Sequence, residues 1–281
     1  MREILNIKGK LAPLISTVCG FRLLQPLYEA AYLFCLLCMN VGSATYGYGE
    51  NGEVRVMKLV KDHFNQVPDP VVIFDVGAHR GDYATNLTRV FGERSRIYCF
   101  EPSAPLFADL KTRVGTFPNF ELYQLGLSDK DESVELYDYG YSIPSMVSDV
   151  VGLTGGRPFT VEIVKTVRLD QFCKERQVER INFLKVDVEG YDLKVLEGAS
   201  EMLCSGNIDF VQFEFGAQSI APRSFFHDFY ELLSPSFDLY RILRNGLYPL
   251  RSYDPKYEIF VSATNYLAIN KSISRQMPAQ N

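Results

Sequence analysis

A chain of 281 residues that is 47% apolar and 22% charged has the composition of an ordinary globular protein. This length accommodates one large α/β domain with an extension and does not require two full domains. The formal net charge is −5, so the charge balance gives no reason to expect a nucleic acid or an acidic membrane as partner. The six cysteines are scattered along the chain, which suggests a reducing compartment and predicts a cytoplasmic protein.

The first 49 residues form an extension ahead of the domain. Its apolar stretch runs from Ala30 to Met39, and no charged residue occurs between Glu29 and Glu50. A membrane span needs roughly twenty predominantly apolar residues, and the continuous apolar part here has about ten. We therefore expect a helix packed against the domain, with an interfacial helix at a membrane surface as the alternative. Residues 46–49 then predict a flexible link.

The most informative stretch begins with a short apolar strand. Residues 71–74 are Val, Val, Ile and Phe, a run typical of a strand that is buried on both faces of a parallel sheet. The strand leads into Asp75 and a turn bounded by Gly77 and Gly81, and residues 82–91 carry apolar side chains at helical spacing. Strand, glycine turn and helix form the first half of a βαβ nucleotide-binding unit.

The next predicted strand, residues 96–100, ends at Glu101, twenty positions beyond Gly81. An acid at this place can accept hydrogen bonds from both ribose hydroxyls of an adenosyl ligand. A dinucleotide site has G-x-G-x-x-G, whose central glycine lets the backbone approach a pyrophosphate. This chain lacks the central glycine and carries Asp75 at the strand tip, where a carboxylate suits an ammonium or a sulfonium group. The pattern therefore favours S-adenosylmethionine over NAD.

Alternating strands and helices continue along the chain. Helices are expected over residues 51–66, 105–114, 169–178 and 222–233, and strands over 120–125, 208–215, 237–243 and 257–269, the last two as a closing antiparallel pair. Residues 133–137 and 160–164 alternate like half-exposed strands of an insert. Between them, residues 140–157 are rich in Gly, Ser and Pro and predict a mobile loop, either a lid or merely solvated. Residues 271–281 predict a loose tail.

A second strand–acid–helix pattern occupies residues 181–192. Asp187 follows the strand, Glu189 comes two positions later, and Glu214 stands near the end of the next strand. Open α/β sheets bind ligands at the carboxyl ends of their strands, so we expect these three acids near a bound ligand. Each is a candidate catalytic residue that could orient a ligand group or accept a proton. For Glu189, an interaction with the dipole of the following helix is the competing interpretation.

Taken together, these stretches resemble the FkbM family of S-adenosylmethionine-dependent methyltransferases over about residues 50–270. The residues that carry the resemblance are Phe74-Asp75-Val76-Gly77-Ala78-His79-x-Gly81, Phe100-Glu101-Pro102, Leu127-Ser128-Asp129 and Leu184-Lys185-Val186-Asp187-Val188-Glu189-Gly190. The family often has asparagine where this chain has His79. The resemblance implies an α/β, Rossmann-like class I fold with a mostly parallel, seven-stranded sheet, helices on both faces and an antiparallel closing strand.

The resemblance also implies a function and a set of site residues. It implies methylation of a hydroxyl on a small-molecule, sugar or lipid-like acceptor. The methyltransferase domain would span residues 50–270, between an extension of residues 1–49 and a tail of residues 271–281. The residues implied to bind the cofactor are Asp75, Gly77, Ala78, His79 and Gly81 on the methionine side, Glu101 at the ribose, Leu127 and Ser128 beside the adenine, and Asp187 near the reacting centre.

Several alternatives stay open at this point. Asp187 and Glu214 could hold a divalent cation, but the sequence places no third acid as a ligand, so the cation stays an open alternative and no metal ligand is assigned. An NAD-dependent oxidoreductase is disfavoured by the missing central glycine. A nucleic-acid methyltransferase is disfavoured by the acidic charge balance and by the lack of an N/D-P-P-Y motif. A scaffold protein that keeps a cofactor pocket without catalysis is the alternative of a different class. The sequence does not indicate the oligomeric state.

Overall fold

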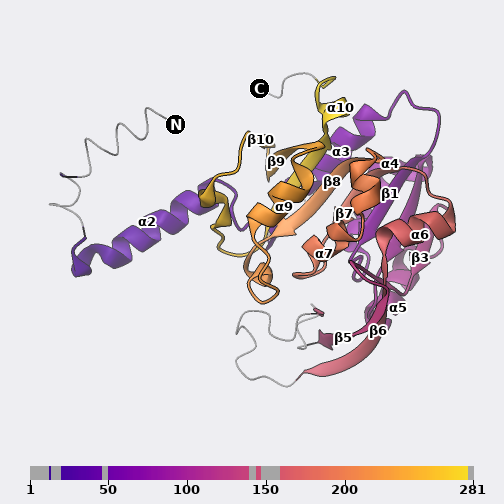
Figure 1. Ribbon diagram of the computed structural model, residues 1–281, viewed down its shortest axis with the longest axis horizontal. Coiled ribbons are helices and arrows are strands. Elements are labelled where there is room, and N and C mark those ends of the chain that lie inside the picture. The colour runs from indigo at the N-terminus through magenta and orange to yellow at the C-terminus, as the bar shows by residue number, and fades with distance from the viewer. Residues whose placement is uncertain (1–12, 14–19, 46–49, 139–143, 147–158, 278–281) are drawn as a thin grey trace. The chain divides into compact units, whose positions relative to one another are not determined.

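The computed structural model describes residues 13, 20–45, 50–138, 144–146 and 159–277 (Figure 1). By their contacts, the residues divide into two units, Met1–Met39 and Asn40–Asn281. The predicted link at residues 46–49 lies outside the described residues, and so does the predicted mobile loop except for residues 144–146.

The first unit contains a short 3-10 helix, η1 (Arg22–Leu24), and the helix α2 (Gln25–Cys38). A proline stands in the first turn of α2, where a backbone N–H would have no partner within the helix. The structure confirms the helix that was predicted in this stretch, and its packing against the domain stays a prediction. Among the described residues, no helix is both long enough and apolar enough to cross a membrane.

The second unit begins earlier than the sequence indicated. The side-chain amide of Asn40 donates a hydrogen bond to the carbonyl oxygen of Ile242 at 2.8 Å. The backbone N–H of Gly42 donates to the hydroxyl of Thr264, also at 2.8 Å. Because of these contacts, residues 40–45 belong with the large unit, and the boundary falls after Met39 rather than after residue 49.

An eight-stranded sheet is the centre of the second unit (Figure 1). Its order is β10-β9-β11-β8-β7-β1-β2-β3, in which β3, β2, β1, β7 and β8 are parallel and β11 is antiparallel to both β8 and β9. The strands are β1 (Val71–Val76), β2 (Ser95–Phe100), β3 (Phe120–Tyr123), β7 (Ile181–Val186), β8 (Ile208–Phe215), β9 (Phe237–Leu243), β10 (Gly246–Leu250) and β11 (Thr264–Asn270). This confirms the mostly parallel Rossmann-like sheet. The sequence did not predict β10, which forms a hairpin with β9 and makes the sheet eight-stranded rather than seven-stranded.

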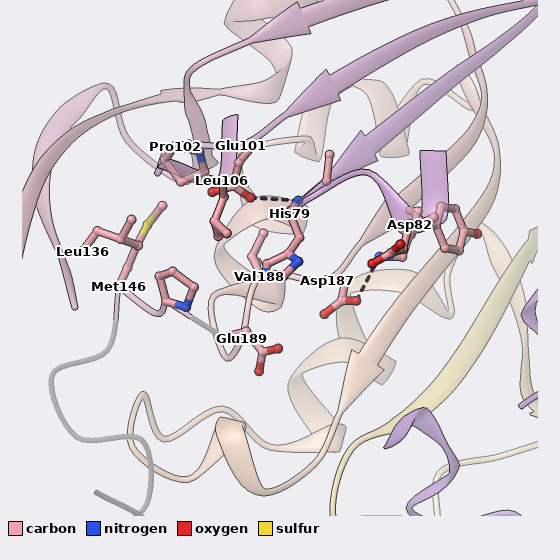
Figure 2. A pocket seen from close by; sticks show the side chains of 15 residues that line it. His79, Asp82, Glu101, Pro102, Leu106, Leu136, Met146, Asp187, Val188 and Glu189 are labelled. Carbon is pink, nitrogen blue, oxygen red and sulfur yellow. Dashed lines mark hydrogen bonds and ion pairs between the residues drawn. The ribbon is translucent and has the colours of Figure 1, made fainter. Parts of the chain in front are cut away.

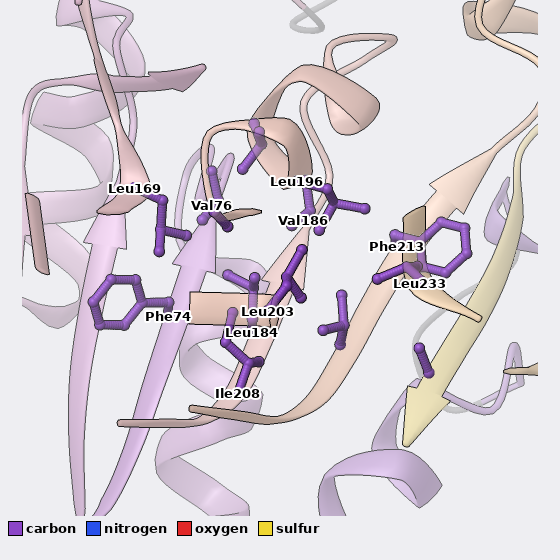
Figure 3. Close-up of a cluster of buried hydrophobic side chains, with 14 of the residues drawn as sticks. Phe74, Val76, Leu169, Leu184, Val186, Leu196, Leu203, Ile208, Phe213 and Leu233 are labelled. Atoms are coloured by element: carbon purple, nitrogen blue, oxygen red, sulfur yellow. The ribbon is translucent and has the colours of Figure 1, made fainter. Parts of the chain in front are cut away.

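Two layers of helices cover the two faces of this sheet. The helices of the second unit are α3 (Glu53–His63), α4 (Asp82–Phe91), α5 (Ala104–Val114), α6 (Leu169–Arg176), α7 (Asp192–Glu197), α8 (Ser200–Cys204), α9 (Phe226–Leu233) and α10 (Lys271–Ser274). One apolar cluster joins the sheet to α6, α7, α8 and α9, and a second joins it to α3, α4, α5 and α10. In the first, Phe74 and Val76 of β1 pack with Leu184 and Val186 of β7 (Figure 3). Successive side chains of a strand point to opposite faces, so Asp75 and Lys185 face the second layer.

Three further strands form a second, smaller sheet. Its strands are β4 (Gly126–Ser128), β5 (Glu132–Asp138) and β6 (Thr160–Arg168), in the order β4-β6-β5. The last two are the strands that were predicted for the insert. The insert has its own apolar cluster of Leu136, Met146 and Val164, which fixes residues 144–146 against β5 and β6.

The C-terminal segment differs from the sequence prediction. Residues 271–274 form α10, which is capped by the side chain of Asn270, and Ile273 is buried. The side chain of Lys271 donates to the carbonyl oxygen of Ser234 at 2.7 Å. The start of the expected loose tail is therefore a packed helix, because it carries an apolar residue and a capping residue. The last strand, β11, begins at Thr264, and residues 255–258 form a 3-10 helix instead.

Candidate functional site

A pocket of about 200 Å³ lies at the carboxyl ends of β1, β2 and β7 (Figure 2). The turns after these strands supply about half of its lining, and the first turn of α4, α5, Lys185 of β7 and the insert supply the rest. The described residues that line it are Gly77, Ala78, His79, Asp82, Tyr83, Glu101, Pro102, Leu106, Leu136, Pro144, Met146, Lys185, Asp187, Val188 and Glu189. This is the edge of the sheet where open α/β proteins bind their ligands.

Gly77 brings the turn after β1 against the end of β7. Its φ is +81°, and a Cβ atom built on it would lie 1.8 Å from the carbonyl oxygen of Asp187. The backbone N–H of Asp187 in turn donates to the carbonyl oxygen of Val76 at 3.0 Å. Only glycine fits this position, because the two strand tips touch through their backbones.

Glu101 holds the turn that carries His79. Its carboxylate accepts a hydrogen bond from the backbone N–H of His79 at 2.9 Å (Figure 2). It accepts a second from the backbone N–H of Ser103, also at 2.9 Å. Burial raises the pKa of Glu101 to about 7, against the lowering effect of these two donors. Each carboxylate oxygen can accept a further hydrogen bond, so Glu101 can also serve a ligand in the pocket.

Lys185 joins two carboxylates beneath the pocket. Its ammonium lies 2.9 Å from an oxygen of Asp187, 3.9 Å from an oxygen of Asp75 and 4.5 Å from the ring centre of Tyr83. The strand register explains the arrangement, because Asp75, Lys185 and Gln212 stand side by side on β1, β7 and β8. Gln212 extends the polar row by donating to a carboxylate oxygen of Glu53 at 2.6 Å.

Asp75 is buried next to Lys185 and does not reach the pocket surface. It is fully buried, and neither of its oxygens has a hydrogen-bond partner among the described residues. Burial raises its pKa to about 6, and the charge of Lys185 opposes this shift. Asp75 does not line the pocket, so its charge reaches a ligand through Lys185 and through the field of the site.

Asp187 and Glu189 line one side of the pocket, and two further acids, Asp192 and Glu214, are buried behind them. Asp192, the first residue of α7, accepts from the backbone N–H groups of Gly190 at 3.3 Å and Glu214 at 3.4 Å. Burial, together with the charge of Asp187, raises the pKa of Asp192 to about 7. Burial also raises the pKa of Glu189 and that of Glu214, and their acidic neighbours add to both shifts. Asp187, paired with Lys185, is therefore the acid of this group that presents its charge to the pocket, while burial holds protons on the acids packed against it.

Residues 75–243, more than half of the chain, match the methyltransferase FkbM domain. The chain belongs to the FkbM methyltransferase family. It is 26% identical over 150 residues to the 2-O-methyltransferase NoeI of Sinorhizobium fredii, a match that covers 48% of this chain and 60% of NoeI. It is 27% identical over 168 residues to the hexuronic acid methyltransferase AglP of Haloferax volcanii, covering 59% of this chain and 64% of AglP. The match thus spans less than two thirds of either relative.

Among solved structures, the fold is similar to Aeropyrum pernix fibrillarin in complex with S-adenosyl-L-methionine. The TM-score is 0.39 and the sequence identity 16%, and the match covers 71% of this chain and 66% of fibrillarin.

The structure brings part of the predicted FkbM-type site together. Among the predicted residues, those that line the pocket are Gly77, Ala78, His79, Glu101, Asp187 and Glu189. Gly81 starts α4 with a φ of +86°, and a Cβ atom there would contact Leu110 at 3.0 Å. Leu127 and Ser128 are buried in β4, and Glu214 is buried in β8, so none of these three residues lines the pocket. Their roles stay predictions.

Sequence reasoning missed Lys185 as a functional residue, together with the pocket wall that the insert supplies. Lys185 was noted in the motif, and its signal was a charged residue inside an otherwise apolar strand. Leu136, Pro144 and Met146 gave no signal, because their place depends on how the insert folds over the sheet. Among the described residues, no group of three or more His, Cys, Asp or Glu side chains is arranged to hold a metal ion.

Proposed function

We propose that this protein is a methyltransferase that uses S-adenosylmethionine to methylate a hydroxyl group of a sugar-like small molecule. The observation that carries the proposal is the placement of Glu101 and Asp187 in one pocket, at the ends of β2 and β7. Membership of the FkbM family supports the reaction class, and the pocket supports the division into a donor side and an acceptor side.

The residues of the pocket fit the proposed cofactor. When bound, S-adenosylmethionine supplies a methyl group on a cationic sulfur. Glu101 lies at the pocket edge with remaining acceptor capacity for ribose hydroxyls. The carboxylates of Asp75 and Asp187, on either side of Lys185, complement a sulfonium and an ammonium group. The same carboxylates would repel a pyrophosphate, which argues against NAD.

Asp187 has the geometry for the proton step. Methyl transfer is an in-line displacement, in which an acceptor oxygen forms a bond to the methyl carbon as the carbon–sulfur bond breaks. The hydroxyl proton must leave during this step, and the Asp187 carboxylate lies in the pocket to orient the hydroxyl and accept the proton. Lys185 fixes the direction of that carboxylate. Leu136 and Met146 limit the access of water from the insert side.

The names of the two relatives support a sugar as acceptor. NoeI is named as a 2-O-methyltransferase, and AglP is named for a hexuronic acid. We therefore place the acceptor among sugars and similar small molecules that carry hydroxyl groups. A non-catalytic protein of the same fold would keep the Glu101 side of the pocket and would have no use for an acid held as Asp187 is.

The test is methyl transfer from isotopically labelled S-adenosylmethionine to a panel of simple glycosides, with mass-spectrometric detection of the methylated product. Asp187→Asn is the control, because it keeps the shape of the side chain and removes its charge. The proposal predicts product with the wild type and at least a hundredfold less with Asp187→Asn. Donor binding without any product across the panel would support the scaffold alternative.

A further inference from the structure

The pocket has two walls of opposite chemical character. Asp187 and Glu189 form one wall, and Leu136, Pro144 and Met146 form the other. In Figure 2, the labelled Leu136 and Met146 lie on one side and Asp187 on the other, with Glu189 below them. An acceptor that reaches Asp187 therefore lies between an acidic surface and an apolar surface.

The acidic wall is not neutralised from within the pocket. Among the described residues that line it, Lys185 is the only lysine or arginine, and its ammonium is shared between Asp187 and Asp75. Asp192 and Glu214 lie directly behind the wall and are both buried. A carboxylate on the acceptor would be repelled by Asp187, and the burial that raises the pKa values of Glu189, Asp192 and Glu214 would disfavour a further negative charge beside them.

The Glu189 turn is fixed in place. Glu189 has a φ of +51°, which is unusual for a residue other than glycine, and its carbonyl oxygen accepts a hydrogen bond from the hydroxyl of Ser145 at 2.8 Å. The same segment of the insert carries Pro144 and Met146. The Ser145 bond therefore ties the two walls to each other, so the acidic and apolar surfaces keep a set separation.

We propose that the acceptor is an uncharged sugar whose C–H face lies on Leu136, Pro144 and Met146, and that Glu189 excludes acceptors with a carboxylate near the reacting hydroxyl. This inference rests on the proposed function and narrows it to neutral acceptors. It separates this chain from its relative AglP, which is named for a hexuronic acid. An apolar wall suits the C–H face of a neutral ring, and the acid wall accepts hydrogen bonds from its hydroxyls.

The experiment uses a matched pair of acceptors, methyl β-glucopyranoside and methyl β-glucopyranosiduronic acid, which differ only at C6, where a carboxylate replaces the hydroxymethyl group. The ratio of kcat/KM for the neutral over the acidic sugar is measured for the wild type, Glu189→Gln and Glu189→Lys at pH 9, where Glu189, whose pKa is raised to about 8, is ionised. Because each variant is compared with itself on two acceptors, a general loss of activity cancels. We expect a ratio of at least ten for the wild type, a smaller ratio for Glu189→Gln, and a ratio near or below one for Glu189→Lys.

Equilibrium binding of the two sugars to the full chain, measured by ligand-observed NMR, gives a readout that does not depend on turnover. The inference is supported if the neutral sugar binds more tightly and if high salt reduces this preference. Equal or tighter binding of the acidic sugar to the wild type overturns it. If neither sugar is methylated while the neutral one binds preferentially, the proposed function fails and the preference for neutral ligands stands.

Discussion

The ammonium of Lys185 lies 2.9 Å from the carboxylate of Asp187, two positions further along the chain. The side chain of Lys185 is only 3% exposed and that of Asp187 is 27% exposed, so the pair links the buried layer of the protein to the pocket. An acid held in this way keeps one direction without a ligand, which reduces the ordering needed when an acceptor binds.

For this reason Asp187→Asn is expected to reduce turnover far more than donor binding. Its proposed role as an orienting group and base operates in the transition state, and loss of such a group typically costs about 10²–10⁴ in rate. Single-turnover kinetics and calorimetric donor binding measure the two effects separately. A variant that methylates its acceptor at the wild-type rate would make Asp187 structural and leave Glu189 and Glu214 as the catalytic candidates.

Lys185→Met is expected to destabilise the fold. It leaves Asp75 and Asp187 without the ammonium between them, and removing one member of a buried ion pair typically costs about 3–5 kcal/mol. Denaturant unfolding measures the change, and Lys58→Met, an exposed lysine on α3, is the matched control. If both variants unfold at the same denaturant concentration, the Lys185 pair has no net effect on stability.

Glu101→Ala is expected to weaken binding of S-adenosylmethionine by about 1–3 kcal/mol through loss of charge-assisted hydrogen bonds. Because the pKa of Glu101 is raised to about 7, the wild-type affinity should also increase between pH 6 and pH 8 as this carboxyl ionises. Calorimetry at several pH values checks both points, with Glu101→Gln as the variant that should lose the pH dependence. Binding of NAD with no response to S-adenosylmethionine would contradict the assignment of the cofactor.

Stability should decrease as the pH rises through the neutral range. The pKa of Asp192 is raised from 3.8 to about 7 in the folded state, so the folded chain binds more protons than the unfolded chain between these values. The free energy of unfolding therefore falls as the pH increases from about 4 to 7 and levels off above, by on the order of a few kcal/mol from this group. Thermal unfolding of the wild type and Asp192→Asn between pH 5 and pH 9 checks this. The stability of the variant should depend less on pH than that of the wild type. An identical dependence in both proteins would exclude Asp192 as its source.

The N-terminal segment gives a separate prediction. The apolar stretch from Ala30 to Met39 is too short for a comfortable membrane span, and α2 is 14 residues long. Full-length protein is expected in the supernatant after high-speed centrifugation, as is a variant that lacks residues 1–39. Recovery of the full-length chain only with detergent, while the shortened chain stays in the supernatant, would instead assign the segment to a membrane surface.

The parts of the fold that the sequence predicted are those with a local signal. The apolar runs of β1 and β7, each followed by an acid, located both strand tips and hence the pocket. The hairpin strand β10 was missed because Pro249 and exposed side chains weaken its strand pattern. The ion pair of Asp75 with Lys185 was missed because it depends on the register between two strands that are more than 100 residues apart in the chain.

The backbone contact at Gly77 has a consequence for how sites of this kind can change. Because the turn after β1 rests directly on the carbonyl of Asp187, the spacing between the Gly77 turn and Asp187 is set by main-chain atoms. The apolar wall, in contrast, comes from side chains of an insert with its own small core. Substitutions in the insert can therefore alter which acceptor is admitted while the geometry at the strand tips is retained, so the insert is the place to begin when engineering a new acceptor preference.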